Sequence, residues 1–489
     1  MSRRIHYAVG LLACVGAPVQ ASEPPVAISY EAAIQRLDRV SGALSSSSHD
    51  VHAAQDTADA LKTLNRPIVS VSAQYLEYQK TLSLDLSGAK SDAASVTSSF
   101  LSALPGSFPA GYQEIVSQVT GRISQALPGL LSAIPDTLSY RYRDGVFRPT
   151  ATAVMPLYTG GATRAVQRGA QAGVALAGAQ QVAAQDLSQI NLVRVYFGQQ
   201  VAAQLYAAAQ QTRDGFDRHL ADARKLEQQG VIPHGRVLQV EVARDTAERT
   251  LVRAEMGYAT ARDELARLLE VDGAAPSTPL FVDSHPLSPV ATFFGSGDRH
   301  PQARAADAAH ALAGAGVDLA KSRQRPQAFA FGEYNFDHGD ALPTEPDWVV
   351  GVGVRYTLLS NIDRRKTVDA AREHEMATAD AAREARKAIV TETVRAYDLV
   401  ETARRSFLLL DSSIAAAEEN LRVQEVSFRE GEATTAAVID AHSALDLARA
   451  QRISTAYEYD LSLAALLAAS SRLGEFTVFL ARADQRLQP

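Results

Sequence analysis

The alternation of apolar and polar residues at positions 348–356 predicts a β-strand with one apolar face. Glycine and arginine occupy the other side of the period-two pleat. The apolar row consists of Trp348, Val350, Val352, Val354 and Tyr356. At about 3.3 Å per residue and a tilt of roughly 40°, the two terminal aromatic residues stand about 20 Å apart along a membrane normal, which matches an apolar band between two aromatic girdles. An ordinary half-buried strand has the same alternation, so the neighbouring segments must decide between the two interpretations.

The segment after this strand predicts one very long helix. From Arg364 to about Glu430 the chain contains no proline and no glycine, and it is rich in alanine, glutamate and arginine. One apolar stripe at helical spacing runs along it, formed by Val394, Tyr397, Val400, Phe407, Leu410, Ile414, Ala417 and Leu421. At 1.5 Å per residue, such a helix is on the order of 100 Å long. A membrane-crossing strand that leads into so long a helix predicts a duct that begins in a membrane and projects from it.

Internal alignment predicts that the chain is a duplicated unit. Residues 156–164 align with residues 357–365 at an offset of 201, and the same offset pairs Gly230 with Gly431. It also pairs Arg194 with Arg395, Tyr196 with Tyr397, Leu220 with Leu421, Ala243 with Ala444 and Tyr258 with Tyr459. Upstream of the strands the offset is 259, which predicts an insertion of 58 residues between the two strands of the first copy.

Each copy is predicted to contain a helix, two strands, a long helix, a tip and a returning helix. The first copy spans 22–271, with strands at about 66–78 and 146–158, the insertion at about 87–144 and a tip at 229–238. The second copy spans 300–474, with strands at about 326–336 and 348–358 and a tip at 430–440. Returning helices are expected at about 233–270 and 435–473. Residues 272–299, rich in Pro, Ser and Gly, predict a connector with little regular structure, and residues 475–489 a tail of low helix propensity.

The N-terminus predicts export. Two arginines precede an apolar stretch followed by small residues up to Ala21, so residues 1–21 have the pattern of a signal peptide. Cys14 is the only cysteine, which excludes an intrachain disulfide, and lipidation at Cys14 is the alternative to cleavage after Ala21. Loss of residues 1–21 moves the net charge from −7 to −9, and an acidic exported chain is a poor nucleic-acid binder. No later apolar run is long enough for a transmembrane helix.

Four strands in lipid predict an oligomer. An open sheet edge leaves backbone groups unpaired there, at several kcal/mol each. A closed barrel needs at least about eight strands, so two or more copies must each contribute four. The apolar stripe of each long helix also requires neighbouring helices. Two, three and four copies all satisfy these conditions.

The order and spacing of these motifs resemble the TolC family of outer-membrane efflux factors over nearly the whole mature chain. The motifs are His-Pro-Gln-Ala-Arg-Ala-Ala at 300–306, Arg66-Pro67, Arg325-Pro326, Pro-Leu-Tyr-Thr-Gly-Gly at 156–161 and the two tip glycines. The resemblance implies a mainly α fold with a membrane β-barrel, in which long antiparallel coiled-coil helices and β-hairpins assemble as a trimeric α-barrel on a 12-stranded β-barrel. It implies a homotrimer in the outer membrane of a Gram-negative bacterium, with most of the mass in the periplasm. The implied partners are outer-membrane lipid, a periplasmic adaptor at the helix tips and an inner-membrane transporter of the RND or ABC type.

The resemblance also assigns roles to single residues. Asp440, nine residues after Gly431, stands where the family forms an acidic ring at the narrow end, although a solvated aspartate near a helix cap is the alternative. Adaptor docking is predicted for Gly230, Val231, Ile232, Gly431, Ala433, Thr434, Val438 and Ile439, with packing of tip against tip as the alternative. The predicted membrane girdle consists of Trp348, Tyr356 and Tyr75. Phe428 and Ala433 replace a tyrosine and an arginine that hold the closed tip in the best-known member.

The sequence predicts no catalytic, cofactor or metal site. Gly351 and Gly353 lie inside a strand with no phosphate-binding helix start after them, and the eleven histidines show no metal-ligand spacing. The leading hypothesis is a passive exit duct for small molecules in a tripartite export system, and the alternative cargo is protein, as in type I secretion. A periplasmic coiled-coil scaffold without a pore is the alternative of another class, and single-channel conductance separates the two.

Overall fold

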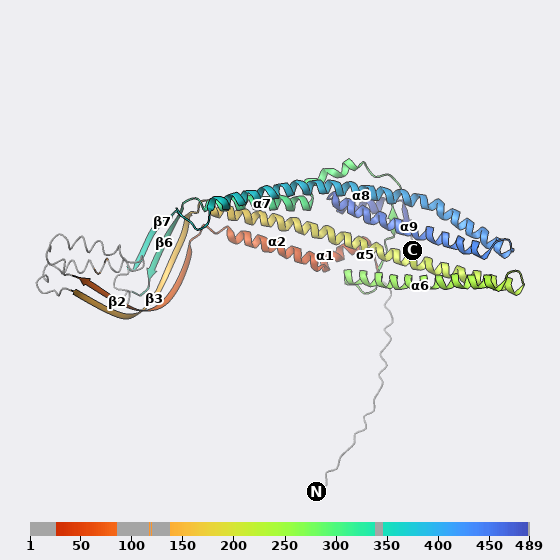
Figure 1. Cartoon of the computed structure of the whole chain (residues 1–489), viewed down its shortest axis with the longest axis horizontal. Coiled ribbons are helices and arrows are strands. Elements are labelled where there is room, and N and C mark those ends of the chain that lie inside the picture. Colours follow the sequence, from red (N-terminus) through yellow and green to blue (C-terminus); the bar gives the residue numbers. More distant parts are fainter. Residues whose placement is uncertain (1–25, 86–116, 118, 120–136, 338–345, 488–489) are drawn as a thin grey trace, which may run out of the picture. The chain divides into compact units, whose positions relative to one another are not determined.

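The computed structural model describes residues 26–85, 117, 119, 137–337 and 346–487. The signal peptide 1–21, Cys14 and most of the insertion at 87–144 lie outside the described residues and stay predictions. The chain forms two compact units, which are described separately (Figure 1). The sheet unit contains residues 52–176 and 306–381, and the core unit contains residues up to 51 together with 177–305 and 382–489.

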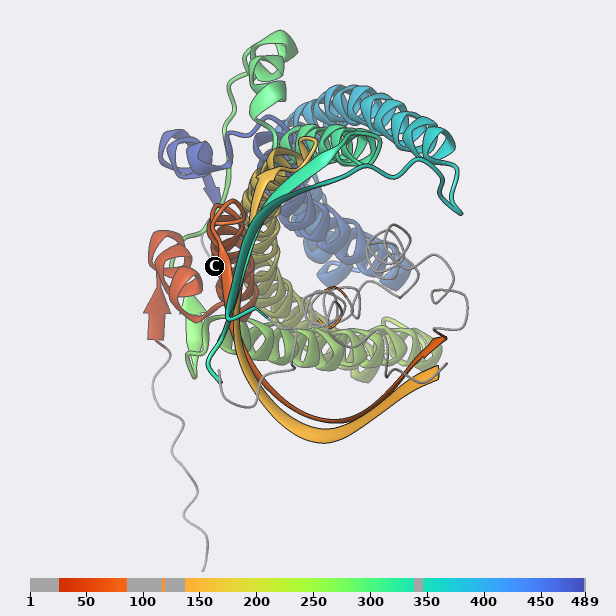
Figure 2. The ribbon, with the colours of Figure 1, turned by 90° about the vertical axis from the view of Figure 1, so that its left-hand side faces the viewer.

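The sheet unit is built on one antiparallel sheet of four strands in the order β2-β3-β6-β7. These are β2 (Ile68–Asp85), β3 (Thr137–Tyr158), β6 (Gln327–Asn335) and β7 (Trp348–Arg355). Figure 2 shows β2 and β3 as a strongly curved pair. The unit also contains half of α2 (Gly42–Leu61), most of α7 (Pro301–Ser322), and the first turns of α5 (Ala162–Gln228) and α8 (Arg364–Arg429). Among the described residues, strands β2 and β7 each have a partner on one side only, so they are the two edges of this sheet.

Two of the strands are longer than the sequence indicated. Strand β3 begins at Thr137 instead of about 146, and β2 ends at Asp85 instead of about 78. Backbone pairing continues beyond the predicted ends because cross-strand contacts continue there. Glu77 and Arg143 supply such a contact, with a 2.7 Å ion pair between exposed side chains.

The core unit contains the returning helices and the short elements that pack on them. Its helices are α1 (Tyr30–Val40), α6 (His234–Leu269), α9 (Thr435–Ala469), α10 (Phe476–Arg482) and the longer parts of α5 and α8. Its remaining elements are β1 (Val26–Ile28), β4 (Ala274–Pro276), β5 (Leu280–Val282), β8 (Gln485–Leu487) and the 3-10 helices η3 (Val290–Arg299) and η4 (Leu473–Glu475). The proline-free and glycine-free segment forms α8 over nearly the predicted length, because helix-forming residues fill it without a break.

The predictions for the connector and the tail are wrong. Residues 272–299 contain β4, which pairs with β1, and β5, which pairs with β8 of the tail. Leu280, Phe281 and Val282 have no exposed surface, and α10 and β8 lie in the stretch predicted to lack structure. Pro, Ser and Gly are unfavourable in long helices, but a strand of three residues needs only three apolar side chains to bury. The connector and the tail therefore belong to the core.

An aromatic cluster and a row of glutamines fasten these segments to α5. The cluster consists of Tyr30, Tyr196, Phe197, Phe281 and Phe476, whose neighbouring ring centroids lie 5.2–6.2 Å apart. Gln199, Gln200 and Gln204 donate side-chain hydrogen bonds to the carbonyl oxygens of Ala274 at 3.2 Å, Pro276 at 2.8 Å and Leu487 at 3.2 Å. Because buried amides otherwise lose their hydration, these bonds explain why a polar row lies on a buried helix face.

Candidate functional site at the helix tips and on the sheet

The tip between α5 and α6 is a tight turn that depends on Gly230. Its φ of 72° lies in the left-handed region that glycine adopts without steric cost. The amide of Gly230 donates to the carbonyl oxygen of Glu227 at 2.8 Å, and the amide of Val231 donates to that of Leu226 at 2.9 Å. This pair of bonds is a Schellman motif, which satisfies the last carbonyl groups of the helix.

The tip between α8 and α9 has the same geometry. Gly431 has a φ of 80°, and its amide donates to Phe428 O at 3.0 Å, while the Glu432 amide donates to Ser427 O at 2.8 Å. Thr434 then caps α9, because its hydroxyl oxygen accepts a hydrogen bond from the Ala437 amide at 3.2 Å. The two glycines that the sequence alignment paired therefore end both helices in the same way.

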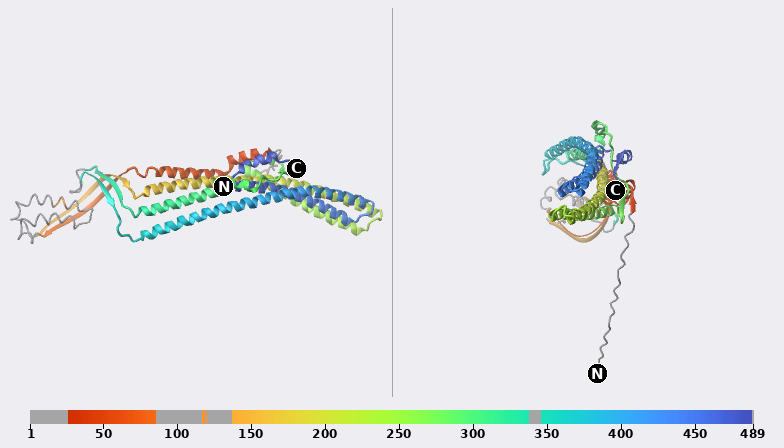
Figure 3. Two further views of the ribbon diagram at one scale, coloured as in Figure 1. Left: turned by 90° about the horizontal axis from the view of Figure 1, so that it is seen from above. Right: turned by 90° about the vertical axis from the view of Figure 1, so that its right-hand side faces the viewer.

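The two tips pack against each other within one chain. Figure 3 shows both turns at the same end of the core unit. A methyl group on Gly431 would lie 3.6 Å from a Val231 side-chain carbon. Beneath the turns lies a small buried core, which consists of Leu220, Ala223, Val237, Val240, Phe428 and Val438.

This packing divides the predicted docking residues into two groups. Val438 is fully buried, so its assignment to an adaptor surface is wrong; apolar tip residues of one chain are covered by one another. Ile232 and Ala433 pack partly on the tip core, and Ile439 is half-buried. The exposed members are Gly230, Val231, Gly431 and Thr434, and Val231 keeps 52% of its surface. Docking at these four positions stays a prediction.

Asp440 lies on the second turn of α9 with an exposed side chain. Within the described part of the chain it makes no ion pair within 4.0 Å. One chain contributes one carboxylate, so the acidic ring stays a prediction that depends on other copies.

Two buried histidines lie close to the tip core, and the sequence interpretation missed them. His219 of α5 and His442 of α9 are each 5% exposed, and the Nε2 atom of neither ring makes a hydrogen bond, although that of His442 lies 3.4 Å from a Glu425 carboxylate oxygen. The His219 ring packs edge-on against Phe428 at 4.6 Å between centroids. Gly215 leaves room for the second ring, because a methyl group there would lie 2.8 Å from a carbon of His442. Their separation in sequence conceals that they share one site.

Burial makes these histidines poor bases. Loss of hydration lowers the pKa of His219 to about 4, and nearby His442 lowers it further. Burial likewise lowers the pKa of His442, whereas it raises the pKa of Asp446 even though Thr212 donates to that carboxyl group at 2.6 Å. Around neutral pH the tip therefore contains two neutral imidazoles.

One face of the sheet is apolar and exposed. Residues directly opposite each other on neighbouring strands have their side chains on the same face of the sheet. The pairing register therefore shows on which face each side chain lies. Val350, Val352 and Val354 are 73, 69 and 72% exposed, and Tyr75 and Trp348, two residues of the predicted girdle, are 70 and 64% exposed. This face carries Val69, Val71, Ala73 and Tyr75 of β2, Ala151 and Ala153 of β3, Gly332 and Tyr334 of β6, and Trp348, Val350, Val352 and Val354 of β7. Tyr356, the third residue of the predicted girdle, follows β7 and is 54% exposed.

The opposite face of the sheet is largely polar. The hydroxyl groups of Ser72 and Thr150 lie 3.0 Å apart, and Arg148 forms a 2.7 Å ion pair with Glu333. The sheet therefore has the two-sided chemistry that a membrane strand needs, with an apolar outer face and a polar inner face.

The glycines of β7 lie on this inner face for a steric reason. A methyl group on Gly351 would lie 2.8 Å from the ring of Phe331, and one on Gly353 would lie 2.6 Å from the ring of Phe329. The two rings belong to β6 and lie over β7, in the space that side chains at positions 351 and 353 would otherwise fill. The glycines are packing sites for two aromatic rings.

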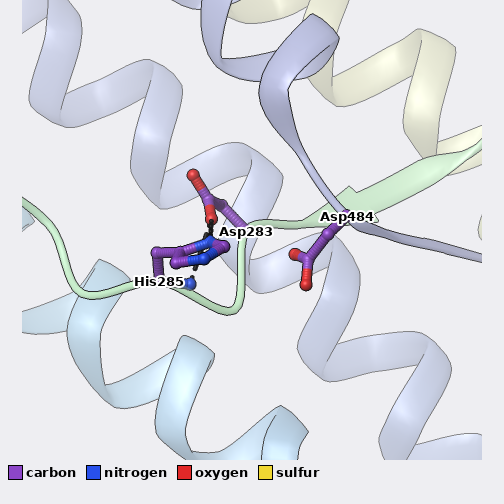
Figure 4. A group of neighbouring side chains, drawn as sticks. All are labelled: Asp283, His285 and Asp484. Atoms are coloured by element: carbon purple, nitrogen blue, oxygen red, sulfur yellow. Dashed lines mark hydrogen bonds and ion pairs between the residues drawn. The ribbon is translucent and has the colours of Figure 1, made fainter.

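A cluster with potential metal ligands lies between the connector and the tail. Figure 4 shows Asp283, His285 and Asp484, whose ligand atoms lie within 4.8 Å of one another. Asp283 accepts from Arg482 at 2.7 Å and from the His285 amide at 3.0 Å. Ser284 donates its amide and its hydroxyl to the two oxygens of Asp484, and these bonds lower the pKa of Asp484 to about 2. These bonds already occupy both carboxylates, so the cluster acts as a clamp between the two segments.

Comparison with known proteins relates the chain to one family of outer membrane proteins. Among the described residues, no helix has both the length and the hydropathy that a membrane crossing requires. Residues 297–472 match the model of the outer membrane efflux protein family. Protein CyaE of Bordetella pertussis is 27% identical over 342 residues, which cover 67% of this chain and 71% of that protein.

Solved structures show the same fold. The outer membrane protein VceC of Vibrio cholerae gives a TM-score of 0.68 at 14% identity, covering 90% of this chain and 95% of that chain. The CmeC outer membrane channel of Campylobacter jejuni gives a TM-score of 0.70 at 12% identity, covering 99% of both chains. The predicted fold class, that of TolC-like channels, is confirmed.

Proposed function

The chain belongs to the TolC-like family of outer membrane efflux proteins, and on this premise we propose that it is the outer-membrane exit duct of an export system. Its cargo moves through it passively, and the energy comes from an inner-membrane transporter. The family and its solved relatives are channels, and we propose no chemistry for the duct itself.

The observation that carries this proposal is the contrast between the two faces of the sheet. Valines on the outer face of β7 keep about 70% of their surface, which is unfavourable in water and favourable in lipid. The inner face offers hydroxyl groups and an Arg148–Glu333 ion pair to water. A wall with these two faces separates a bilayer from an aqueous lumen.

The open edges of the sheet support assembly from several copies. Strand β7 of one chain would pair with β2 of the next, and the alternating strand directions continue without interruption across that junction. Closure removes the unpaired edges, which are costly in lipid. We propose three copies and twelve strands, the number that the family relation favours, with most of the mass in the periplasm.

The helix tips would form the entrance and the docking surface. We propose that Asp440 from each copy contributes to an acidic ring that favours cations. A periplasmic adaptor would contact the exposed tip residues, above all Val231 and Thr434, and an RND or ABC transporter would supply the cargo. Small molecules are the proposed cargo, in keeping with the efflux family.

Planar-bilayer recording of the purified mature protein tests this proposal. The wild type is expected to form discrete channels with a preference for cations. Asp440→Asn should reduce that preference with little change in channel formation. The matched control is Asp272→Asn, which removes an equally exposed charge outside the tips. Absence of channels contradicts the duct, whereas channels with unchanged selectivity contradict only the ring.

A further inference from the structure

The segment between β7 and α8 exposes more apolar surface than a water-facing turn would. Residues 357–363 are here called the junction loop. Leu358, Leu359 and Ile362 in this loop are 80, 92 and 62% exposed. Three large aliphatic side chains so close together on a surface require a covering partner.

The exposure does not come from a loosely held backbone. The Arg364 guanidinium donates to Arg323 O at 2.8 Å and to the Thr357 carbonyl oxygen. The side-chain amide of Gln324 donates to Arg364 O at 2.9 Å. Asp363 caps α8 by accepting from the Arg365 amide at 2.9 Å and the Lys366 amide at 3.1 Å. The loop is therefore anchored at both ends with its leucines directed outward.

The first copy of the repeat indicates that a neighbouring strand does not cover these leucines. The internal alignment pairs Leu157 and Tyr158 with Leu358 and Leu359. Leu157 and Tyr158 end β3, where Tyr158 pairs with β6 and the pairing with β2 has already stopped at Val154, and both residues are 50% exposed. The strand beside them thus leaves this row half exposed in the first copy, and the same is expected for the second copy.

Cationic residues lie beside the loop, at the start of α8 and after the end of α7. Arg365 and Lys366 open α8 with exposed side chains, and within the described residues neither makes an ion pair within 4.0 Å. Arg323 and Arg325 are exposed at the end of α7 and just beyond it. The carboxylate of Asp363 interacts with both Arg365 and Lys366, and one carboxylate against two cations leaves a positive balance. Leucines beside this excess of positive charge are complementary to the acyl chains and phosphate of an anionic phospholipid.

We propose that the junction loop binds an anionic phospholipid of the leaflet next to the helices, with Leu358 and Leu359 among the acyl chains and Arg365 and Lys366 at the phosphate. This inference rests on the proposed function, because it requires the outer face of the sheet to contact lipid. The lipid-facing row of Val350, Val352 and Val354 leads through Tyr356 into the loop, so the two apolar surfaces are continuous in sequence.

Fluorescence quenching by brominated lipid tests the position of the loop. Trp348 is the only tryptophan of the chain, so Trp348→Phe with Leu359→Trp moves the probe to the loop. Leu359 is almost fully exposed, and the substitution should leave folding unchanged. The mature full-length variant is reconstituted in vesicles of phosphatidylcholine and phosphatidylglycerol. We expect strong quenching by acyl-chain bromine, and weak quenching of a control with Trp348→Phe and Leu187→Trp on α5.

The preference for the anionic headgroup is measured in the same vesicles. Because one cation near an anionic surface favours binding by roughly fivefold, bromine on phosphatidylglycerol should quench at a several-fold lower mole fraction than bromine on phosphatidylcholine. Adding Arg365→Gln and Lys366→Gln to the probe variant should abolish that difference. Adding Arg253→Gln and Arg262→Gln, two exposed arginines of α6, should preserve it.

The outcomes separate this inference from the function on which it rests. Quenching of Trp348 in the wild type without quenching of the Leu359→Trp probe overturns the inference and leaves the duct intact. If neither lipid bromine nor aqueous acrylamide quenches that probe, a second copy covers the loop, and the inference is also overturned. No quenching at either position contradicts lipid contact by the sheet as well. Equal quenching by both lipids overturns the anionic preference.

Discussion

The sheet unit and the core unit place their side chains in opposite ways. In the sheet unit, Val350 and Val354 are more than 70% exposed, whereas in the core unit the carboxyl groups of Asp283 and Asp460 are 1% and 0% exposed. The core unit buries even these polar groups where its short elements pack on the helices, although its long helices leave apolar side chains such as Leu187 and Leu409 exposed. The sheet unit leaves a whole apolar face uncovered, so the partner of that face must come from outside the chain. The difference teaches that one chain completes the packing around its short elements and leaves the sheet without a partner on one face.

Removal of a core aromatic residue should produce the largest effect. Phe281 has no exposed surface and lies near the rings of Phe197, Tyr459 and Phe476. Phe281→Ala should lower the free energy of unfolding of the core unit by about 3–5 kcal/mol. Phe147→Ala, at a residue 52% exposed on β3, should cost less than about 1 kcal/mol in detergent. Denaturant titration followed by circular dichroism measures the free energy of unfolding of both variants. Equal losses in the two variants would contradict the difference between the core unit and the sheet unit.

A charge on the outer face of the sheet should have the next largest effect. Val352→Arg should destabilise the protein in vesicles by about 2–4 kcal/mol, because arginine is costly near the middle of a bilayer. Val349 points to the inner face and opposes Glu333, so Val349→Arg should be nearly neutral. Urea titration of folding into lipid vesicles compares the two variants. If both cost the same, the assignment of the two faces fails.

Acidification should loosen the helix tips. The pKa of His219 in the folded protein is about 4, which lies below the ordinary value of 6.5. The contribution of the neutral His219 ring to the stability of the folded tip is therefore complete above pH 6.5, and it is lost as the pH falls toward 4. The full loss is roughly 2–3 kcal/mol. His442 acts in the same direction, whereas the raised pKa of Asp446 opposes it.

Hydrogen exchange at the tip amides, corrected for intrinsic rates, measures this effect between pH 7 and pH 5. His219→Phe should abolish most of the pH dependence while keeping the ring packing against Phe428. A wild-type tip that stays equally protected at both pH values would show that the histidines do not control its opening.

The smallest predicted effect concerns glycines. Gly353→Ala should cost about 1–2 kcal/mol, because the new methyl group would lie 2.6 Å from the Phe329 ring. Gly178 on α5 has no neighbour within 4 Å, so Gly178→Ala should stabilise the helix by roughly 0.5–1 kcal/mol. Thermal unfolding of each variant shows whether its substitution stabilises or destabilises the protein. A stabilised Gly353→Ala variant would contradict the packing explanation.

Periodicity predicted the elements with a strong local signal. Alternation located β7, and an unbroken run of helix formers located α8, because each depends on the residues of one segment. Gly230 and Gly431 identified both tips for the same reason: a left-handed turn at a helix end is a local requirement.

The local sequence pattern could not predict features that depend on residues far apart in the chain. The strand at Leu280–Val282 is stable because it pairs with Gln485–Leu487, about two hundred residues later. The burial of Val438 and the meeting of His219 with Phe428 arise from packing of one hairpin on the other. Composition and local pattern contain no record of these pairings.

Thiol modification during single-channel recording tests the central claim, a wall between lipid and an aqueous lumen, most directly. Cys14→Ser removes the only cysteine, and Ser72→Cys or Val350→Cys then places one thiol on the inner or the outer face. The account predicts that a charged, water-soluble thiol reagent lowers the conductance of the Ser72→Cys channel and leaves that of the Val350→Cys channel unchanged. The reverse pattern, or a reconstituted protein that conducts no ions, would contradict it.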